Sequence, residues 1–135
     1  MYIDIINRMK PTISLYEGGL LEYGVYDCNL MFLRIFEPRI HDKIRKRYKT
    51  VRGGVRVAKS ATGYASIKQL LEGSSDYEQI PFHNQMAGDV IIYDKHDVIM
   101  NIGNGNWFLV DDTKTFAVKK KRDHLEDKCV VFRRV

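Results

Sequence analysis

Cys28 is the residue best placed for chemistry in this chain, because it lies at the predicted start of a helix. Asp27 before it is a good N-cap residue, since its carboxylate accepts hydrogen bonds from the unpaired amides of the first helical turn. An apolar run over 29–36 continues the helix, and Pro38 closes it. The positive end of the helix dipole favours a thiolate at position 28. The pattern therefore predicts a cysteine nucleophile, with a small buried packing residue as the alternative.

The segments before and after this helix carry weaker helical patterns. Residues 12–22 show apolar spacing that Gly18 and Gly19 interrupt. Residues 38–51 are basic, with apolar residues in helical spacing. We therefore expect helical structure in both segments.

Glycines and a serine divide the next stretch. Gly53-Gly54 is expected to break the chain or to change its direction, and Gly63 to stop a short helix that follows the pair. Ser66 is a candidate N-cap for a helix over 67–72. Residues 73–86 are rich in Gly, Ser, Asp and Asn and are expected to form a loop.

The sequence period changes after Ala87. Five runs rich in β-branched or aromatic residues predict strands, at 89–93, 98–102, 107–110, 116–118 and 129–132. The Gly-Asn-Gly-Asn run at 103–106 predicts a hairpin turn. Helices followed by a meander of strands predict an α+β fold, with N-terminal helices packed on a C-terminal antiparallel sheet. A length of 135 residues fits a single domain over 1–135.

Composition excludes several classes of protein. A hydrophobic content of 44% and three prolines are typical of a globular protein, not of a disordered chain. No signal peptide and no membrane span are expected, because the chain has neither a basic N-terminal region nor a long apolar run. Cys28 and Cys129 match no disulfide framework or metal motif, so we expect no metal and no cofactor. Cys129 opens an apolar run that predicts a core strand. The polar neighbours of His41, His83 and His124 predict a surface position for each.

Positive charge gathers in one segment, although the formal net charge is only +5. The candidate polyanion-binding residues are Lys43, Arg45, Lys46, Arg47, Lys49 and Arg52, with Arg56 and Lys59 close behind. Such density attracts nucleic acid or another polyanion, and a solvated helix face gives the same pattern. A second basic run lies at 119–122, and no nucleic-acid-binding motif accompanies either run.

A block in the second half of the chain carries a family motif. Gly88-Asp89 precedes an apolar strand, and the run that starts at Val98 reads Val-x-x-x-Ile-Gly-Asn-Gly-x-x-Phe. Residues 87–110 resemble the second half of the NlpC-type papain-like cysteine peptidases. Nearly the whole chain resembles a small-protein branch of that family found in bacteriophage tail gene clusters.

The features of that branch occur here in the same order. They are an aromatic-Gly-x-x-Asp-Cys start, an Arg-Tyr pair, a Gly-Tyr pair before a Leu-rich helix, Gly-Asp-Val, and a terminal strand that ends in a basic residue and valine. In this chain they occupy 23–28, 47–48, 63–64, 88–90 and 132–135.

The resemblance implies a papain-like fold and a place in the virion tail. It implies a tail component or tail assembly protein, made in the host cytoplasm, with other phage tail proteins as partners. It also implies an alternative, a cysteine hydrolase that cuts peptide or amide bonds of peptidoglycan. In such enzymes a cleft lies beside the nucleophile, and Tyr23 and Tyr26 are candidates for lining it; both also fit half-buried aromatic residues. A basic module that contacts DNA is the third interpretation.

The chain departs from the family pattern at the catalytic base. Active members place His directly before the valine of the second strand, and Asp97 holds that position here. His96 lies one residue early, where strand alternation points it to the other face unless a bulge restores it. A carboxylate at position 97 is a poor base toward a thiol and raises the thiol pKa. We therefore take Cys28, His96 and Asp97 as the candidate catalytic residues, and expect weak hydrolysis or none.

Overall fold

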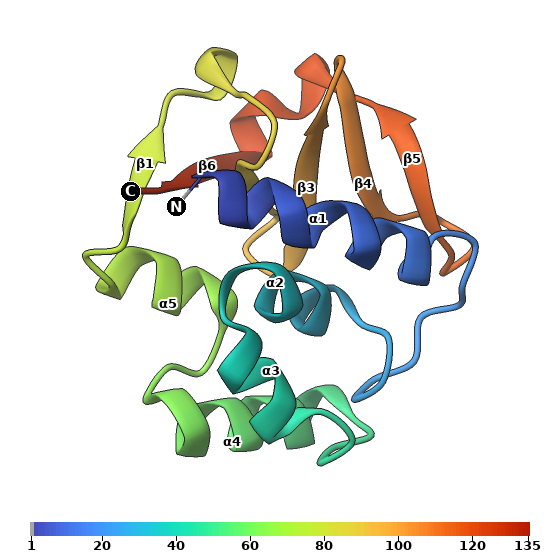
Figure 1. Ribbon diagram of the computed structural model, residues 1–135, viewed down its shortest axis with the longest axis vertical. Helices are drawn as coiled ribbons and strands as arrows, with labels where there is room; N and C mark the ends of the chain where they lie inside the picture. Colours follow the sequence, from blue (N-terminus) through green and yellow to red (C-terminus); the bar gives the residue numbers. More distant parts are fainter. Residues whose placement is uncertain (1) are drawn as a thin grey trace.

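The computed structural model describes residues 2–135, in which the helices precede the strands along the chain (Figure 1). The helices are α1 (Tyr2–Tyr16), α2 (Cys28–Phe36), α3 (Pro38–Ile44), α4 (Val51–Thr62) and α5 (Ile67–Gly73). The strands are β1 (Tyr77–Ile80), β2 (Val90–Tyr93), β3 (Asp97–Gly103), β4 (Asn106–Val110), β5 (Phe116–Lys120) and β6 (Cys129–Arg134). Two 3-10 helices are η1 (Phe82–Asn84) and η2 (Asp123–Lys128). The predicted α+β class is confirmed.

One antiparallel sheet holds all six strands, in the order β1-β6-β2-β3-β4-β5. Each of the five predicted strands is present, with ends that differ by a residue or two. Gly103 and Gly105 have positive φ angles of 87° and 74°, as the predicted hairpin turn between β3 and β4 requires. Strand chemistry and turn chemistry therefore define most of the sheet.

Side chains of the strands alternate between two apolar clusters, one on each face of the sheet. Val98, Met100 and Phe108 belong to the larger cluster, which α1 and α2 cover. Trp107, which is fully buried, belongs to the smaller cluster together with Leu125 of η2. Figure 1 shows α1 lying across the sheet, with α3 and α4 at the far end of the molecule.

α1 begins earlier than the sequence predicted. It spans Tyr2–Tyr16 and ends before Gly18, whereas the helical pattern was found over 12–22. Pro11 lies inside the helix, where a proline ordinarily argues against one. The buried face follows helical spacing and consists of Ile5, Met9, Thr12 and Tyr16. Packing of this face on the sheet outweighs the local signal of the proline.

The basic segment 38–51 is helical only in its first half, so the prediction holds for α3 and fails for the residues after it. α3 ends at Ile44, and Lys46 adopts a positive φ angle of 65°. The amide of Lys46 donates to the carbonyl oxygen of Gly24 at 2.6 Å. A contact with a residue twenty-two positions earlier in the chain therefore sets the end of α3.

Gly53 and Gly54 lie inside α4 and do not break the chain, contrary to the prediction. α4 begins after Thr50, whose hydroxyl accepts a hydrogen bond from the amide of Gly53 at 3.0 Å. A Cβ atom added to Gly54 would lie 3.1 Å from the ring of Tyr48. The glycine pair therefore makes room for an aromatic ring against the helix. At its other end α4 stops at Gly63, as predicted, with a φ angle of 83°.

The segment 73–86, predicted as a loop, contains β1 and η1. β1 pairs with β6, so that Tyr77 lies opposite Arg134 at one edge of the sheet. The partner strand is more than fifty residues away in the sequence, which is why local composition predicted a loop. The short helix before it is as expected, since Ser66 caps α5 by accepting from the amide of Gln69.

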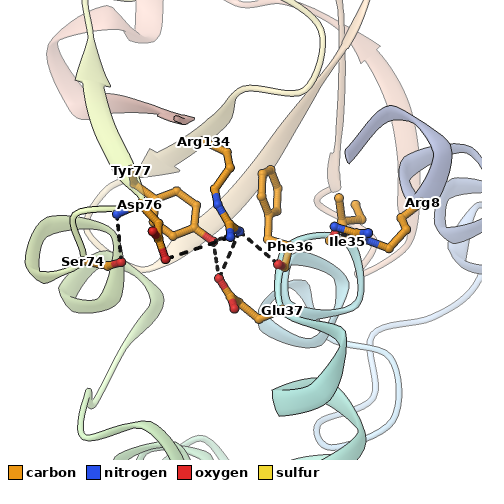
Figure 2. A network of polar contacts seen from close by, with 8 residues as sticks. All are labelled: Arg8, Ile35, Phe36, Glu37, Ser74, Asp76, Tyr77 and Arg134. Atoms are coloured by element: carbon orange, nitrogen blue, oxygen red, sulfur yellow. Dashed lines mark hydrogen bonds and ion pairs between the residues drawn. The ribbon is translucent and has the colours of Figure 1, made fainter. Parts of the chain in front are cut away.

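The C-terminal end of α2 is held by two arginines from distant elements. Arg134 donates to the carbonyl oxygen of Phe36 and to the carboxylate of Glu37, both at 3.2 Å (Figure 2). Arg8 of α1 donates to the carbonyl oxygen of Ile35 at 2.5 Å (Figure 2). Cations at this end satisfy carbonyls that lack partners within the helix and complement its dipole. α2 is therefore fixed relative to the sheet.

Candidate functional site

Asp27 joins three parts of the chain at the N-terminal end of α2. Its carboxylate accepts hydrogen bonds from the amides of Leu30 at 2.8 Å and Gly24 at 2.9 Å. The hydroxyl of Tyr48 donates to the same carboxylate at 2.5 Å. Asp27 is only 3% exposed. The predicted N-cap is confirmed, and the same carboxylate also fastens the loop before α4 to the helix start.

Gly24 allows two backbone segments to touch beside Asp27. Its φ angle is 85°, and a Cβ atom added there would lie 1.9 Å from the carbonyl oxygen of Tyr48. No side chain fits in that space. The close approach explains why a glycine stands three residues before the N-cap.

Cys28 faces the start of β3. The backbone amide of Val98 interacts with its sulfur, and the carboxylates of Asp27 and Asp97 lie nearby. Burial is the main cause that raises the pKa of the Cys28 thiol, from 9.0 to about 12; the Val98 amide lowers it, and the two carboxylates raise it. The residue as a whole is half-buried. Burial and negative charge therefore outweigh the helix dipole, and the side chain is a neutral thiol at neutral pH.

Asp97 and His96 lie as expected from their positions at the start of the second predicted strand. Asp97 is the first residue of β3 and pairs with Tyr93 of β2 without a bulge. His96 lies in the turn before it, exposed, and its backbone amide donates to the carbonyl oxygen of Tyr93 at 3.2 Å. Within residues 2–135, no histidine ring is hydrogen-bonded to the sulfur of Cys28.

The other histidines have their own surroundings. His41 is buried, at 6% exposure, so the predicted surface position was wrong. It shares the inner face of α3 with Ile44, three residues later, and its Nδ1 atom lies 3.1 Å from Asp42. His83 and His124 are exposed, as predicted. His124 lines the same cleft as Cys28, but within residues 2–135 none of the three rings is hydrogen-bonded to the sulfur.

A cleft of about 630 Å³ opens beside Cys28. The residues that line it include parts of α4, the start of α2, and the turn and strand that hold His96 and Asp97, and further lining comes from α5, from β4 with the turn after it, and from η2. The part contributed by α4 is a stripe of small and apolar residues, Val51, Gly54, Val55, Ala58 and Thr62. The cleft therefore combines an apolar helix face with a thiol and a carboxylate.

The two candidate cleft tyrosines differ in position. Tyr23 lines the cleft and is 42% exposed. Tyr26 does not line it, because its ring packs edge to face on Tyr16 with ring centroids 5.1 Å apart. The structure thus brings Tyr23, Cys28, His96 and Asp97 to one cleft and leaves Tyr26 in the packing behind it.

Asp111 lines the cleft, but its carboxylate binds residues of its own turn and does not orient a histidine ring. Its Oδ1 atom accepts from the hydroxyl of Thr113 at 2.6 Å and from the amide of Thr115 at 3.1 Å. The hydrogen bond from the Thr113 hydroxyl is the main cause that lowers the pKa of Asp111. Its carboxylate is thus occupied within its own turn.

Other kinds of site are not found in the part of the chain that the structure describes. Residues 2–135 contain no group of three or more His, Cys, Asp or Glu side chains arranged for a metal ion. No helix among them combines the length and the hydropathy needed to cross a bilayer.

Residues 3–123 match a protein family described as Domain of unknown function (DUF6950). The chain belongs to this family. A comparison with curated proteins finds no match. The fold is similar to the crystal structure of the P60 domain from the M. avium paratuberculosis antigen MAP1272c, with a TM-score of 0.57 and 15% sequence identity over 99% of this chain and 95% of that chain. A DUF6950 domain of this kind therefore has the papain-like α+β fold of NlpC/P60 domains.

The sequence did not reveal the part played by Tyr48 in this DUF6950 domain. Its hydroxyl binds Asp27 and its ring packs against α4, so it links the two sides of the cleft. The Arg47-Tyr48 pair was visible as a motif, but its contact lies twenty-one residues away along the chain. Proximity of that kind follows only from the fold.

Alkylation measures the state of the thiol. Iodoacetamide should label Cys28 slowly at pH 8, because a pKa of about 12 leaves about one thiol in 10⁴ ionised, and the rate should rise about tenfold per pH unit up to about pH 11. The reaction is followed by mass spectrometry in a Cys129→Ser background. Asp97→Asn should react faster, since it removes a negative charge beside the sulfur, whereas Asp94→Asn in the turn should not. Labelling at pH 7 as fast as that of free cysteine would contradict this assignment.

Proposed function

We propose that this protein is a papain-like domain that has lost thiol catalysis and acts as a structural or interaction component of a bacteriophage tail. One observation carries the loss of catalysis: Asp97 stands beside Cys28 where the family motif has a histidine. A carboxylate is far too weak a base to deprotonate a thiol whose pKa is raised by burial. The cleft then serves as a surface for binding or packing.

The tail as the site of action is supported by the sequence resemblance. The aromatic-Gly-x-x-Asp-Cys start at 23–28 and the Gly-Asp-Val run at 88–90 are shared with small proteins of phage tail gene clusters. The partners are then other tail proteins, and the location is the virion tail after synthesis in the host cytoplasm. A domain of this kind works by being held in an assembly and needs no turnover.

The second candidate is an active cysteine hydrolase that cuts peptide or amide bonds of peptidoglycan. The observation in its favour is that His96 and Cys28 line the same cleft in a fold similar to a P60 domain. A rotation of the exposed His96 side chain toward Cys28 would supply a base, with Asp97 beside it.

A pair of measurements separates the candidates. Purified protein should not hydrolyse peptidoglycan stem peptides above the rate of Cys28→Ala, and the Cys28→Ala phage should remain infectious with the protein in its particles. Deletion of the protein should give defective tails. Cys129→Ala is the matched control, since it removes the other thiol.

Two outcomes would overturn the proposal. One is robust turnover that Cys28→Ala abolishes, in which case loss of activity in His96→Ala would identify the base. The other is that the Cys28→Ala protein folds and enters the particles, but the particles do not infect. The thiol would then be required for its chemistry. Normal tails after deletion would refute the tail role.

A further inference from the structure

The charge of this protein is divided between two regions of opposite sign. Residues 39–59 hold nine of the 22 basic residues and only one of the 17 acidic residues, Asp42. This segment therefore carries +8, and the remainder of the chain carries −3. The net charge of +5 conceals this asymmetry. It concentrates positive potential on α3, α4 and the loop between them.

The nine cations form a surface that we name the α3–α4 basic face. They are Arg39, Lys43, Arg45, Lys46, Arg47, Lys49, Arg52, Arg56 and Lys59, and all are exposed. Within residues 2–135, none of them takes part in an ion pair. Some basic residues elsewhere do, as Arg133 does with Asp89 and Arg134 with Glu37. The positive charge of this face is not neutralised by the chain itself.

α4 presents its cations on a stripe of their own. Arg52, Arg56 and Lys59 follow i, i+4 and i+7 spacing, so they lie along one side of the helix. Val57 and Ala61 pack against the core, and a third stripe lines the cleft. Like charges at this spacing repel each other, and α4 itself contains no acidic residue that would offset the repulsion. The α3–α4 basic face is thus separate from the cleft, at the end of the molecule away from the sheet (Figure 1).

We propose that the α3–α4 basic face binds the phosphate backbone of double-stranded DNA without reading its sequence. Arginine and lysine at varied spacing suit repeated phosphates, which give sequence-independent affinity through counterion release. Residues 39–59 contain one aromatic residue, Tyr48, which is 9% exposed, so this face offers no ring on which single-stranded bases stack.

Two other partners fit this surface less well. A bilayer surface is bound by helices with large apolar residues beside their cations, and the exposed apolar residues here, Val51 and Val55, line the cleft. A protein interface has a core depleted in charge, whereas this face consists of cations throughout. Duplex DNA remains the partner whose chemistry matches.

Fluorescence anisotropy with a labelled duplex of about 20 base pairs tests the proposal through its salt dependence. The protein should bind at about 50 mM salt, and the logarithm of the association constant should fall linearly with that of the salt concentration. For the variant Arg52→Gln/Arg56→Gln/Lys59→Gln, the slope of this salt dependence should be shallower by about 2.7. Each lost phosphate contact reduces the slope by about 0.9. A second triple variant, Lys43→Gln/Arg47→Gln/Lys49→Gln, should behave alike.

The matched control is Lys10→Gln/Lys119→Gln/Lys120→Gln, which removes the same charge from exposed positions on α1 and β5. Its slope should equal that of the parent protein. Absence of binding at about 50 mM salt, or an equal loss in the control, would overturn the proposal. Equal affinity for polyglutamate or for phosphatidylglycerol vesicles would also overturn it, since an acidic protein or a membrane would then be the better match. Thermal melting confirms that each variant is folded.

Discussion

Gly24→Ala is expected to destabilise the protein by more than about 3 kcal/mol, measured as the free energy of unfolding in urea. The new methyl group would lie 1.9 Å from the backbone oxygen of Tyr48, which cannot rotate away as a side chain would. The loop must therefore move. Its movement breaks the hydrogen bond from the Lys46 amide to Gly24 and the one from the Tyr48 hydroxyl to Asp27. Each such hydrogen bond contributes about 1 kcal/mol or more.

Gly18→Ala is the matched control for this substitution. Gly18 has nearly the same φ angle, 80°, but an added Cβ atom there meets nothing within 4 Å. Only the backbone strain of a left-handed alanine remains, which costs about 1 kcal/mol. The difference between the two variants isolates the close approach at Gly24. Equal losses in both would show that the junction between 24 and 48 is not tightly packed.

Arg133→Met is expected to lower the free energy of unfolding by about 3–5 kcal/mol, because it leaves the buried carboxylate of Asp89 without its partly exposed counter-ion. Arg133 donates to the two carboxylate oxygens of Asp89 at 2.8 and 2.9 Å and to the carbonyl oxygen of Asn84 at 2.9 Å. The Asp89 side chain is only 1% exposed. When the guanidinium is removed, the Asp89 carboxylate still accepts the hydrogen bond from the amide of Met86.

Two further variants make this prediction specific. Arg122→Met removes an exposed arginine that has no ion pair within residues 2–135, and should change the free energy of unfolding by no more than about 0.5 kcal/mol. The double variant Asp89→Leu/Arg133→Met should recover part of the loss, since no unpaired charge stays buried. Unchanged stability of Arg133→Met in urea would show that the pair contributes nothing to the fold.

The ion pair also explains the Gly-Asp-Val motif at 88–90. Asp89 connects β2 to the last strand through Arg133, and its second oxygen accepts from the Met86 amide at 2.9 Å. The carboxylate is fully used in holding strands and loop together. The Gly-Asp-Val run therefore has a structural role in this chain.

Much of this fold could be predicted from the sequence, because many helix ends and strands depend on residues close together in the chain. The cap at Asp27, the cap at Ser66 and the stop at Gly63 depend on residues within about four positions, and all three are present. The strands after Ala87 follow from residues that prefer strands and from the turn glycines between them. The alignment of the family motif also placed Asp97 beside the thiol, where the structure has it.

Only the tertiary structure decided the features that depend on distant segments. β1 exists because it pairs with β6, and α3 ends where its following loop meets Gly24. The state of Cys28 is the clearest case. The sequence places it at the positive end of a helix, which favours a thiolate, and near Asp97, which disfavours one; burial under residues remote in the chain is the main cause that raises its pKa to about 12. Helix dipoles and caps act within one helical turn, so nearby residues in the sequence determine them. Desolvation depends on every residue that packs around a group, and only the fold brings those residues together.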